Sequence, residues 1–125
     1  MSKPRVAILG ASSDRSKFGN KSLRAHAQAG YEAVPVNPKG GDIEGRTAVR
    51  SLAEVARPIA RISVYLPPAL GLAALAEIAD AGADEVWFNP GTESPEIRRK
   101  VDELGIPAVF GCSIVDLGLS PAQFP

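Results

Sequence analysis

The sequence predicts an α/β fold, a single Rossmann-like domain with a doubly wound, parallel, five-stranded sheet. Short apolar runs alternate along the chain with amphipathic runs, which is the pattern of alternating strands and helices. The apolar runs are mostly continuous, as they are in strands buried on both faces. The chain has 125 residues, of which 45% are hydrophobic. We therefore expect one domain over residues 1–125, with one packed core.

The first half of the chain begins with a buried strand over Val6–Leu9, which ends at Gly10. A helix is expected over Lys21–Ala29, since a glycine follows it at a typical helix end. A second strand over Tyr31–Val36 ends where an Asn-Pro pair begins. The segment Thr47–Val55 is short and is expected to form a helical turn.

The second half continues the alternation. A third strand is expected over Ile59–Leu66, where two prolines end it, and an Ala/Leu-rich helix over Leu70–Ala81. A fourth strand over Glu85–Phe88 ends at the sequence Asn-Pro-Gly. A final strand is expected over Pro107–Phe110.

The helix before the last strand has the clearest boundaries. Ser94 is a typical N-cap, and Pro95 follows it at the favoured first helical position. Ile97 and Val101 then fall on one face, and Gly105 ends the helix. Because right-handed crossovers leave few topologies, we expect the strand order 3-2-1-4-5.

The carboxyl ends of the strands are the expected ligand site, as in other open α/β sheets. The strongest indication is the turn that starts at Gly10, where glycine permits a tight turn and a small polar loop precedes a helix. Such turns bind phosphate groups through backbone N–H groups, and two basic side chains in the loop add positive charge. The predicted binding residues are Gly10, Ala11, Ser12, Ser13, Arg15, Lys17, Asn37, Pro38, Lys39, Leu66, Pro67, Pro68, Asn89, Pro90 and Gly91.

The first turn departs from the dinucleotide fingerprint Gly-x-Gly-x-x-Gly, because Ser12 and Arg15 occupy the second and third glycine positions. After the second strand, an NAD site usually has an acidic residue that holds the ribose hydroxyls. This chain has Lys39 in that region. A lysine suits a phosphate on the ribose, which leaves NADP and coenzyme A as candidate ligands.

Four segments carry a resemblance to a known family: VAILGAS (6–12), GYEAVPVNPK (30–39), VWFNPG (86–91) and VFGC (109–112). In order and spacing they resemble the CoA-binding-domain family of small stand-alone proteins, which is similar to the N-terminal domain of the succinyl-CoA synthetase alpha subunit. The resemblance implies coenzyme A at the strand ends. It implies the first loop facing the phosphates and Lys39 near the adenosine phosphate. The segments 66–68 and 89–91 would line the pantetheine arm, with 66–68 also on the adenine side.

Composition excludes several other classes of function. Fourteen basic and fourteen acidic side chains balance, which indicates neither a nucleic-acid partner nor an anionic membrane surface. No apolar run is long enough to span a bilayer, and the N-terminus has no signal-peptide pattern. A cytoplasmic protein with a small-molecule ligand is expected. The single cysteine, Cys112, excludes an intrachain disulfide, and we interpret it as a small buried side chain.

The sequence offers little catalytic machinery. The only histidine, His26, falls inside the first predicted helix and is expected to be a surface or packing residue. We therefore expect a CoA or acyl-CoA binding protein that is not itself a catalyst. Two alternatives stay open: an NADP-dependent enzyme or nucleotide-binding regulator, and a partner-binding module that has lost its ligand.

Overall fold

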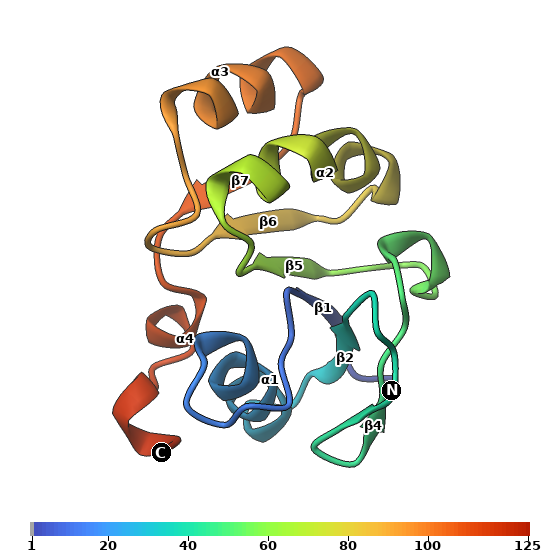
Figure 1. Cartoon of the computed structure of the whole chain (residues 1–125), viewed down its shortest axis with the longest axis vertical. Coiled ribbons are helices and arrows are strands. Elements are labelled where there is room, and N and C mark those ends of the chain that lie inside the picture. Colours follow the sequence, from blue (N-terminus) through green and yellow to red (C-terminus); the bar gives the residue numbers. More distant parts are fainter. Residues whose placement is uncertain (1) are drawn as a thin grey trace.

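The computed structural model describes residues 2–125, and a parallel sheet of five strands forms its centre (Figure 1). The strands of this sheet are β1 (Arg5–Leu9), β2 (Glu32–Val36), β5 (Arg61–Val64), β6 (Glu85–Phe88) and β7 (Ala108–Phe110). The helices are α1 (Phe18–Gln28), α2 (Pro68–Ala81), α3 (Pro95–Leu104) and the short α4 (Ser113–Asp116). A two-stranded hairpin, β3 (Asp42–Ile43) and β4 (Arg46–Thr47), and the 3-10 turns η1 (Leu52–Glu54) and η2 (Pro121–Gln123) complete the structure.

Both faces of the sheet are covered, which confirms the predicted Rossmann-like α/β class. Successive side chains of a strand point to opposite faces. In β1, Ala7 and Leu9 pack with the core that contains buried residues of α2, α3 and η1. Val6 and Ile8 pack on the other face with Leu23 of α1. Burial on both faces therefore explains why the strand sequences are continuously apolar, as predicted.

The predicted strand order 3-2-1-4-5 is wrong in one respect. The observed order is β2-β1-β5-β6-β7, which is 2-1-3-4-5 when the five strands are counted along the chain. Pro35 supplies the reason. The N–H of Glu32 donates to the Pro4 carbonyl at 2.8 Å, on the β1 side. Backbone groups of successive residues point to opposite sides of a strand, so the nitrogen of Pro35, three residues later, faces the outer edge. Proline cannot donate a hydrogen bond to a further strand, and β2 therefore lies at the edge of the sheet.

The connection after β2 covers that edge. Val49 bonds β2 through its N–H to the Pro35 carbonyl at 3.0 Å, and its own carbonyl accepts from the Asn37 N–H at 2.9 Å. The expected helical turn over Thr47–Val55 is thus mostly extended chain and shortens to η1. The chain then crosses to the opposite side of β1, where β5 pairs with β1 in parallel.

Some helix boundaries follow the expected signals and others do not. Ser94 caps α3 by accepting a hydrogen bond from the Ile97 N–H at 3.2 Å, as predicted. Helix α1 begins at Phe18, three residues before the expected start, and α4 and η2 were not predicted. Helix α4 packs beside α1 and leads to the C-terminus (Figure 1). Within residues 2–125, no helix combines the length and apolar character needed to cross a bilayer.

Candidate functional site

The carboxyl end of β1 and the start of α1 approach each other at two glycines. Gly10 has a backbone φ of +93°, and a Cβ atom there would lie 2.9 Å from the Tyr65 carbonyl oxygen. A Cβ atom on Gly19 would lie 2.3 Å from the Gly10 carbonyl oxygen. Neither position has space for a side chain. The absence of two side chains therefore brings the helix start against the strand end.

A cleft of about 310 Å³ opens at this point, on the carboxyl side of the sheet. It lies where β1 and β5 are neighbours, which is the switch point of this strand order. Six of the predicted binding residues line it: Gly10, Lys17, Leu66, Pro67, Pro90 and Gly91. Four lining residues were not predicted: Phe18, Gly19, Tyr65 and Thr92. The structure thus brings together the ends of β1, β5 and β6.

The turn after β2 joins the first loop but lies outside this cleft. The Asn37 side-chain amide donates to the Ala11 carbonyl at 2.9 Å, and its oxygen accepts from the Lys39 N–H at 2.8 Å. Arg50 lies over the same turn and donates to the Pro38 carbonyl at 3.0 Å. Two basic side chains, Lys39 and Arg50, therefore flank one exposed turn. Arg50 was not predicted, since only the bridge between Val36 and Val49 brings it to this turn.

The first loop is less open to a ligand than its sequence indicates. The N–H groups of Gly10 and Ala11 both donate to the Val36 carbonyl, at 3.3 Å. Asp14 accepts from the Ser16 hydroxyl at 2.7 Å, and hydrogen bonds from Ser16 hold the pKa of that carboxyl below its usual value. The backbone donors for an anion must therefore come from later in the loop or from the start of α1.

Two other predicted residues of this loop have different surroundings. Arg15 extends toward the β3–β4 hairpin, where it forms an ion pair with Glu44 at 3.4 Å. Lys17 is the N-cap of α1, which has no side-chain cap at this end, and it lines the cleft. Ser12 is half-buried and Ser13 exposed; neither they nor Ala11 line the cleft.

Asn89 is buried, with 2% of its surface exposed, and its amide is fully used inside the protein. The nitrogen donates to the Val64 carbonyl at 2.9 Å and to the Ser63 hydroxyl at 3.0 Å. The oxygen accepts from the N–H and from the hydroxyl of Ser113, both at 2.9 Å. Asn89 therefore fixes the ends of β5 and β6 and the start of α4. Pro90 and Gly91, which follow it, are the residues that face the cleft, and Pro68, inside α2, does not line it.

A smaller recess of about 100 Å³ adjoins the cleft. Phe18, Tyr65, Asn89, Pro90 and Cys112 line it. Burial raises the pKa of the Tyr65 phenol, although hydrogen bonds with Ser113, Ser22 and Ser63 oppose the shift. The Ser113 hydroxyl donates its only proton to the Asn89 side-chain oxygen. In the 3.2 Å contact between the Tyr65 and Ser113 hydroxyl oxygens, the Tyr65 phenol is therefore the donor.

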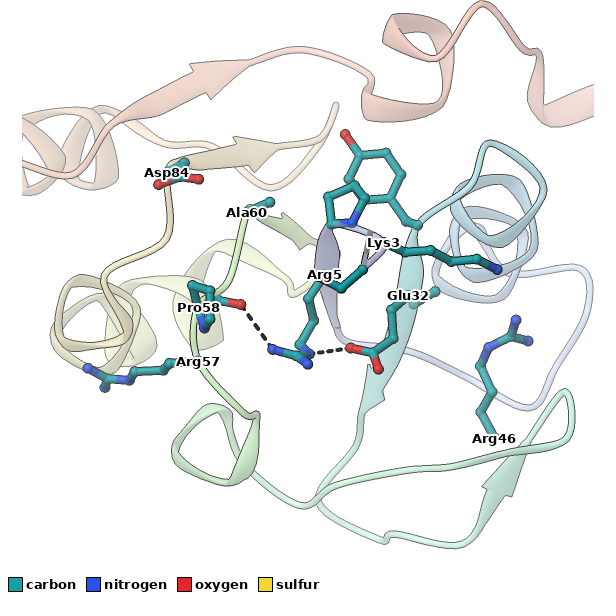
Figure 2. Close-up of a pocket in the computed structure, with 12 residues that line it drawn as sticks. Lys3, Arg5, Glu32, Arg46, Arg57, Pro58, Ala60 and Asp84 are labelled. Carbon is teal, nitrogen blue, oxygen red and sulfur yellow. Dashed lines mark hydrogen bonds and ion pairs between the residues drawn. The ribbon is translucent and has the colours of Figure 1, made fainter.

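A hollow of about 780 Å³ lies at the opposite rim of the sheet (Figure 2). Figure 2 shows Arg5 at its centre, paired with Glu32 and donating to the Pro58 carbonyl. Arg57 points away from the hollow in the same view. The positive charge of Arg5, at the centre of the hollow, is thus already neutralised by Glu32. None of the predicted binding residues lines this hollow, and in open α/β sheets this is not the rim where ligands bind.

The sequence predicts that His26 is a surface or packing residue, and the structure shows it buried as a packing residue. Its Nδ1 donates to the Ser22 carbonyl at 2.9 Å, so the neutral Nε2 accepts from Arg61 at 3.4 Å. Burial, helped by the nearby Arg61 charge, lowers the pKa of His26 to about 4. Arg61 is itself buried. Hydrogen bonds to Asp116 and Glu85 outweigh its desolvation and raise its pKa. Among residues 2–125, no three His, Cys, Asp or Glu side chains gather in a way that would hold a metal ion.

Five parallel strands in this order, with helices on both faces and a cleft at the switch point, define a small Rossmann-like α/β protein. Within that class the chain belongs to the CoA binding domain family, whose model matches residues 4–118.

The chain is also similar to a curated protein and to solved structures of comparable length. The uncharacterized protein YneT of Bacillus subtilis is 29% identical over 101 residues, which are 81% of this chain and 75% of YneT. A conserved hypothetical protein from Pyrococcus furiosus is 37% identical, with a TM-score of 0.82, and the match covers 93% of this chain and 99% of that one. A protein from Thermus thermophilus is 32% identical, with a TM-score of 0.83 over 91% of this chain and 87% of its own.

The fold also recurs inside a larger enzyme. A dinucleotide-forming acetyl-coenzyme A synthetase from Ca. Korarchaeum cryptofilum has a TM-score of 0.73 at 21% identity. The match covers 86% of this chain but only 25% of that enzyme. At this identity the likeness is one of fold.

Proposed function

We propose that this chain binds coenzyme A along the carboxyl rim of its sheet and catalyses no reaction of its own. The observation that carries the proposal is the cleft itself. It lies at the switch point between β1 and β5, and six residues predicted from the sequence line it. Membership of the CoA binding domain family gives the ligand class.

The pyrophosphate is assigned to the start of α1. This helix has eleven residues and no side-chain cap, so its first N–H groups and its dipole favour an anion. Lys17 adds a positive charge at the cleft. Gly19, which has no side chain, allows the start of the helix to pack on the Gly10 carbonyl at the edge of the cleft.

The phosphate on the adenosine ribose is assigned to the turn after β2. Lys39 and Arg50 flank this turn, and β2 lies at the edge of the sheet beside the first loop. Guanidinium and ammonium groups form charge-assisted hydrogen bonds with phosphate oxygens. These two side chains are exposed, so their contribution is expected to fall with added salt.

The pantetheine arm is assigned to the apolar part of the cleft. Leu66 and Pro67 form one wall, and Pro90 and Gly91 form the other. This arm is a mostly apolar chain with two amide groups, and such a ligand suits apolar walls with nearby backbone polar groups.

The non-catalytic part of the proposal is supported by the surroundings of the titratable groups. His26 is buried on the face that carries α1, neutral, and hydrogen-bonded through both ring nitrogens. Tyr65 donates its proton inward and has a raised pKa. Neither group is poised as a nucleophile or base near neutral pH.

Amide chemical-shift mapping with coenzyme A tests the position of the site. The largest shifts are expected at Lys17, Gly19, Leu66 and Gly91, with smaller ones at Lys39. Residues of the amino-rim hollow, such as Ala33 and Asp84, are the internal control and are expected to stay unchanged. Shifts confined to the amino rim would refute the assignment. Equal shifts with NADP at the same residues would favour the dinucleotide alternative.

A further inference from the structure

We propose that the recess beside the cleft receives a short, uncharged acyl group carried on the thiol of coenzyme A, so that the preferred ligand is a short-chain acyl-CoA. The recess is the space of about 100 Å³ lined by Phe18, Tyr65, Asn89, Pro90 and Cys112. This inference rests on the proposed function, because it concerns the far end of the same ligand.

The recess lies where the thiol end of the ligand is expected. Lys39 follows β2 at one edge of the sheet, and Cys112 follows β7 at the other. Four strand spacings separate these edges, which is about 19 Å. A ligand whose ribose phosphate lies at the first edge and whose pantetheine arm follows the cleft therefore runs toward the second. The recess shares Phe18, Tyr65 and Pro90 with the cleft, so the two spaces lie side by side.

The lining of the recess favours an apolar occupant. Phe18, Pro90 and Cys112 supply apolar walls. The polar atoms beside them are already committed, since the Asn89 amide bonds Ser63, Val64 and Ser113. A charged acyl group, such as one ending in a carboxylate, would lose its water there without gaining a partner.

The size of the recess sets the chain length. A space of about 100 Å³ accommodates two to four carbons and excludes a long fatty chain. Phe18 stands at the entrance, with 57% of its surface exposed. An acyl group in the recess would cover part of this exposed ring, and removing that apolar surface from water favours binding. Each buried methylene is expected to tighten binding about fourfold.

Calorimetric titration of the purified protein with coenzyme A, acetyl-CoA, butyryl-CoA, succinyl-CoA and palmitoyl-CoA tests the inference. Butyryl-CoA, with two methylenes and a methyl group to bury, is expected to bind at least about tenfold more tightly than coenzyme A. Succinyl-CoA and palmitoyl-CoA are expected to bind no more tightly than coenzyme A. Equal affinities for coenzyme A and butyryl-CoA would overturn the acyl site but leave coenzyme A binding intact. Failure of all five ligands to bind a folded protein would contradict the proposed function itself.

Two variants locate the effect. Cys112→Phe fills the recess, and the ratio of the butyryl-CoA to coenzyme A affinities is expected to fall to about one. Phe18→Ala removes an exposed wall and is expected to lower the same ratio, which keeps the test available if Cys112→Phe does not fold. Val115→Phe is the matched control, because Val115 lies on α4 with 60% of its surface exposed. A butyryl-CoA preference that survives both recess variants would place the acyl group elsewhere.

Discussion

Gly19 in the first turn of α1 packs directly on the carbonyl group of Gly10 at the end of β1. A Cβ atom at Gly19 would lie 2.3 Å from the Gly10 carbonyl oxygen, well inside any allowed contact. The pair sets how closely the helix N-terminus approaches the strand end, and both residues line the cleft. The geometry of the proposed phosphate site therefore depends on two side chains that are absent.

Gly19→Ala is expected to destabilise the protein by about 1–3 kcal/mol, because the helix must move away from β1. Ligand affinity should fall with it. Urea unfolding and a coenzyme A titration measure the two effects. Gly71→Ala is the matched control, since a Cβ atom added to this helical glycine would lie at an ordinary 3.6 Å from the Ile97 side chain. There alanine should be neutral or stabilising by about 0.5–1 kcal/mol. Similar effects of both substitutions would show that the Gly10–Gly19 contact has no special role.

Removing the 3′-phosphate of coenzyme A is expected to weaken binding about tenfold, through the loss of charge-assisted hydrogen bonds to Lys39 and Arg50. In the variant Lys39→Ala/Arg50→Ala the difference between coenzyme A and 3′-dephospho-CoA should disappear. Calorimetry with both ligands makes the comparison. Lys100→Ala, an exposed lysine on α3, is the control. Equal affinities of the wild-type protein for the two ligands would remove Lys39 from the site.

Acidification is expected to destabilise the fold through His26. Burial lowers its pKa to about 4, against about 6.5 in an unfolded chain. As the pH falls, His26 is therefore protonated in the unfolded chain before it is protonated in the folded protein. The contribution of His26 to stability is complete above pH 6.5 and is lost as the pH falls from about 6.5 to about 4. The full difference is on the order of 3 kcal/mol.

The test is urea unfolding of the wild type and of His26→Gln at several pH values between 4 and 7. The variant should be less stable at pH 7, with a flatter dependence on pH over this window. Parallel pH profiles for the two proteins would mean that His26 titrates normally in the folded state.

Asn89→Ala is expected to cost about 2–4 kcal/mol of stability, because it leaves Ser113 and the Val64 carbonyl without their buried partner. Asn37→Ala is the control. That side chain is half-buried, and its bonds are to Ala11 and Lys39 only, so about 1 kcal/mol is expected. Thermal unfolding gives both values. An equal loss for the two variants would deny Asn89 its role in holding β5, β6 and α4 together.

Much of the fold could be predicted from the sequence because its signals are local. Continuous apolar runs identified the strands, and Ser94, Pro95 and Gly105 identified the boundaries of α3. The strand order was wrong because it was taken from general topology, although Pro35 carried the needed information. A proline inside a strand confines that strand to an edge.

The candidate site could be predicted only where it follows strand ends. Gly10, Leu66, Pro67, Pro90 and Gly91 line the cleft because the carboxyl ends of parallel strands meet at one rim. Arg50 and Tyr65 were missed. Arg50 reaches the turn after β2 only through the irregular segment that covers the sheet edge, and no local pattern encodes that path. Asn89 belongs to the interior, because its partners lie in β5 and α4.

Calorimetric titration of ligand-free protein with coenzyme A tests the central claim most directly. Native mass spectrometry of the purified protein first establishes that the cleft holds no copurified ligand. We expect one coenzyme A site per chain, with a dissociation constant in or below the micromolar range, and much weaker binding of NADP. The absence of binding at millimolar coenzyme A, in protein whose circular dichroism is that of a folded α/β domain, would contradict it.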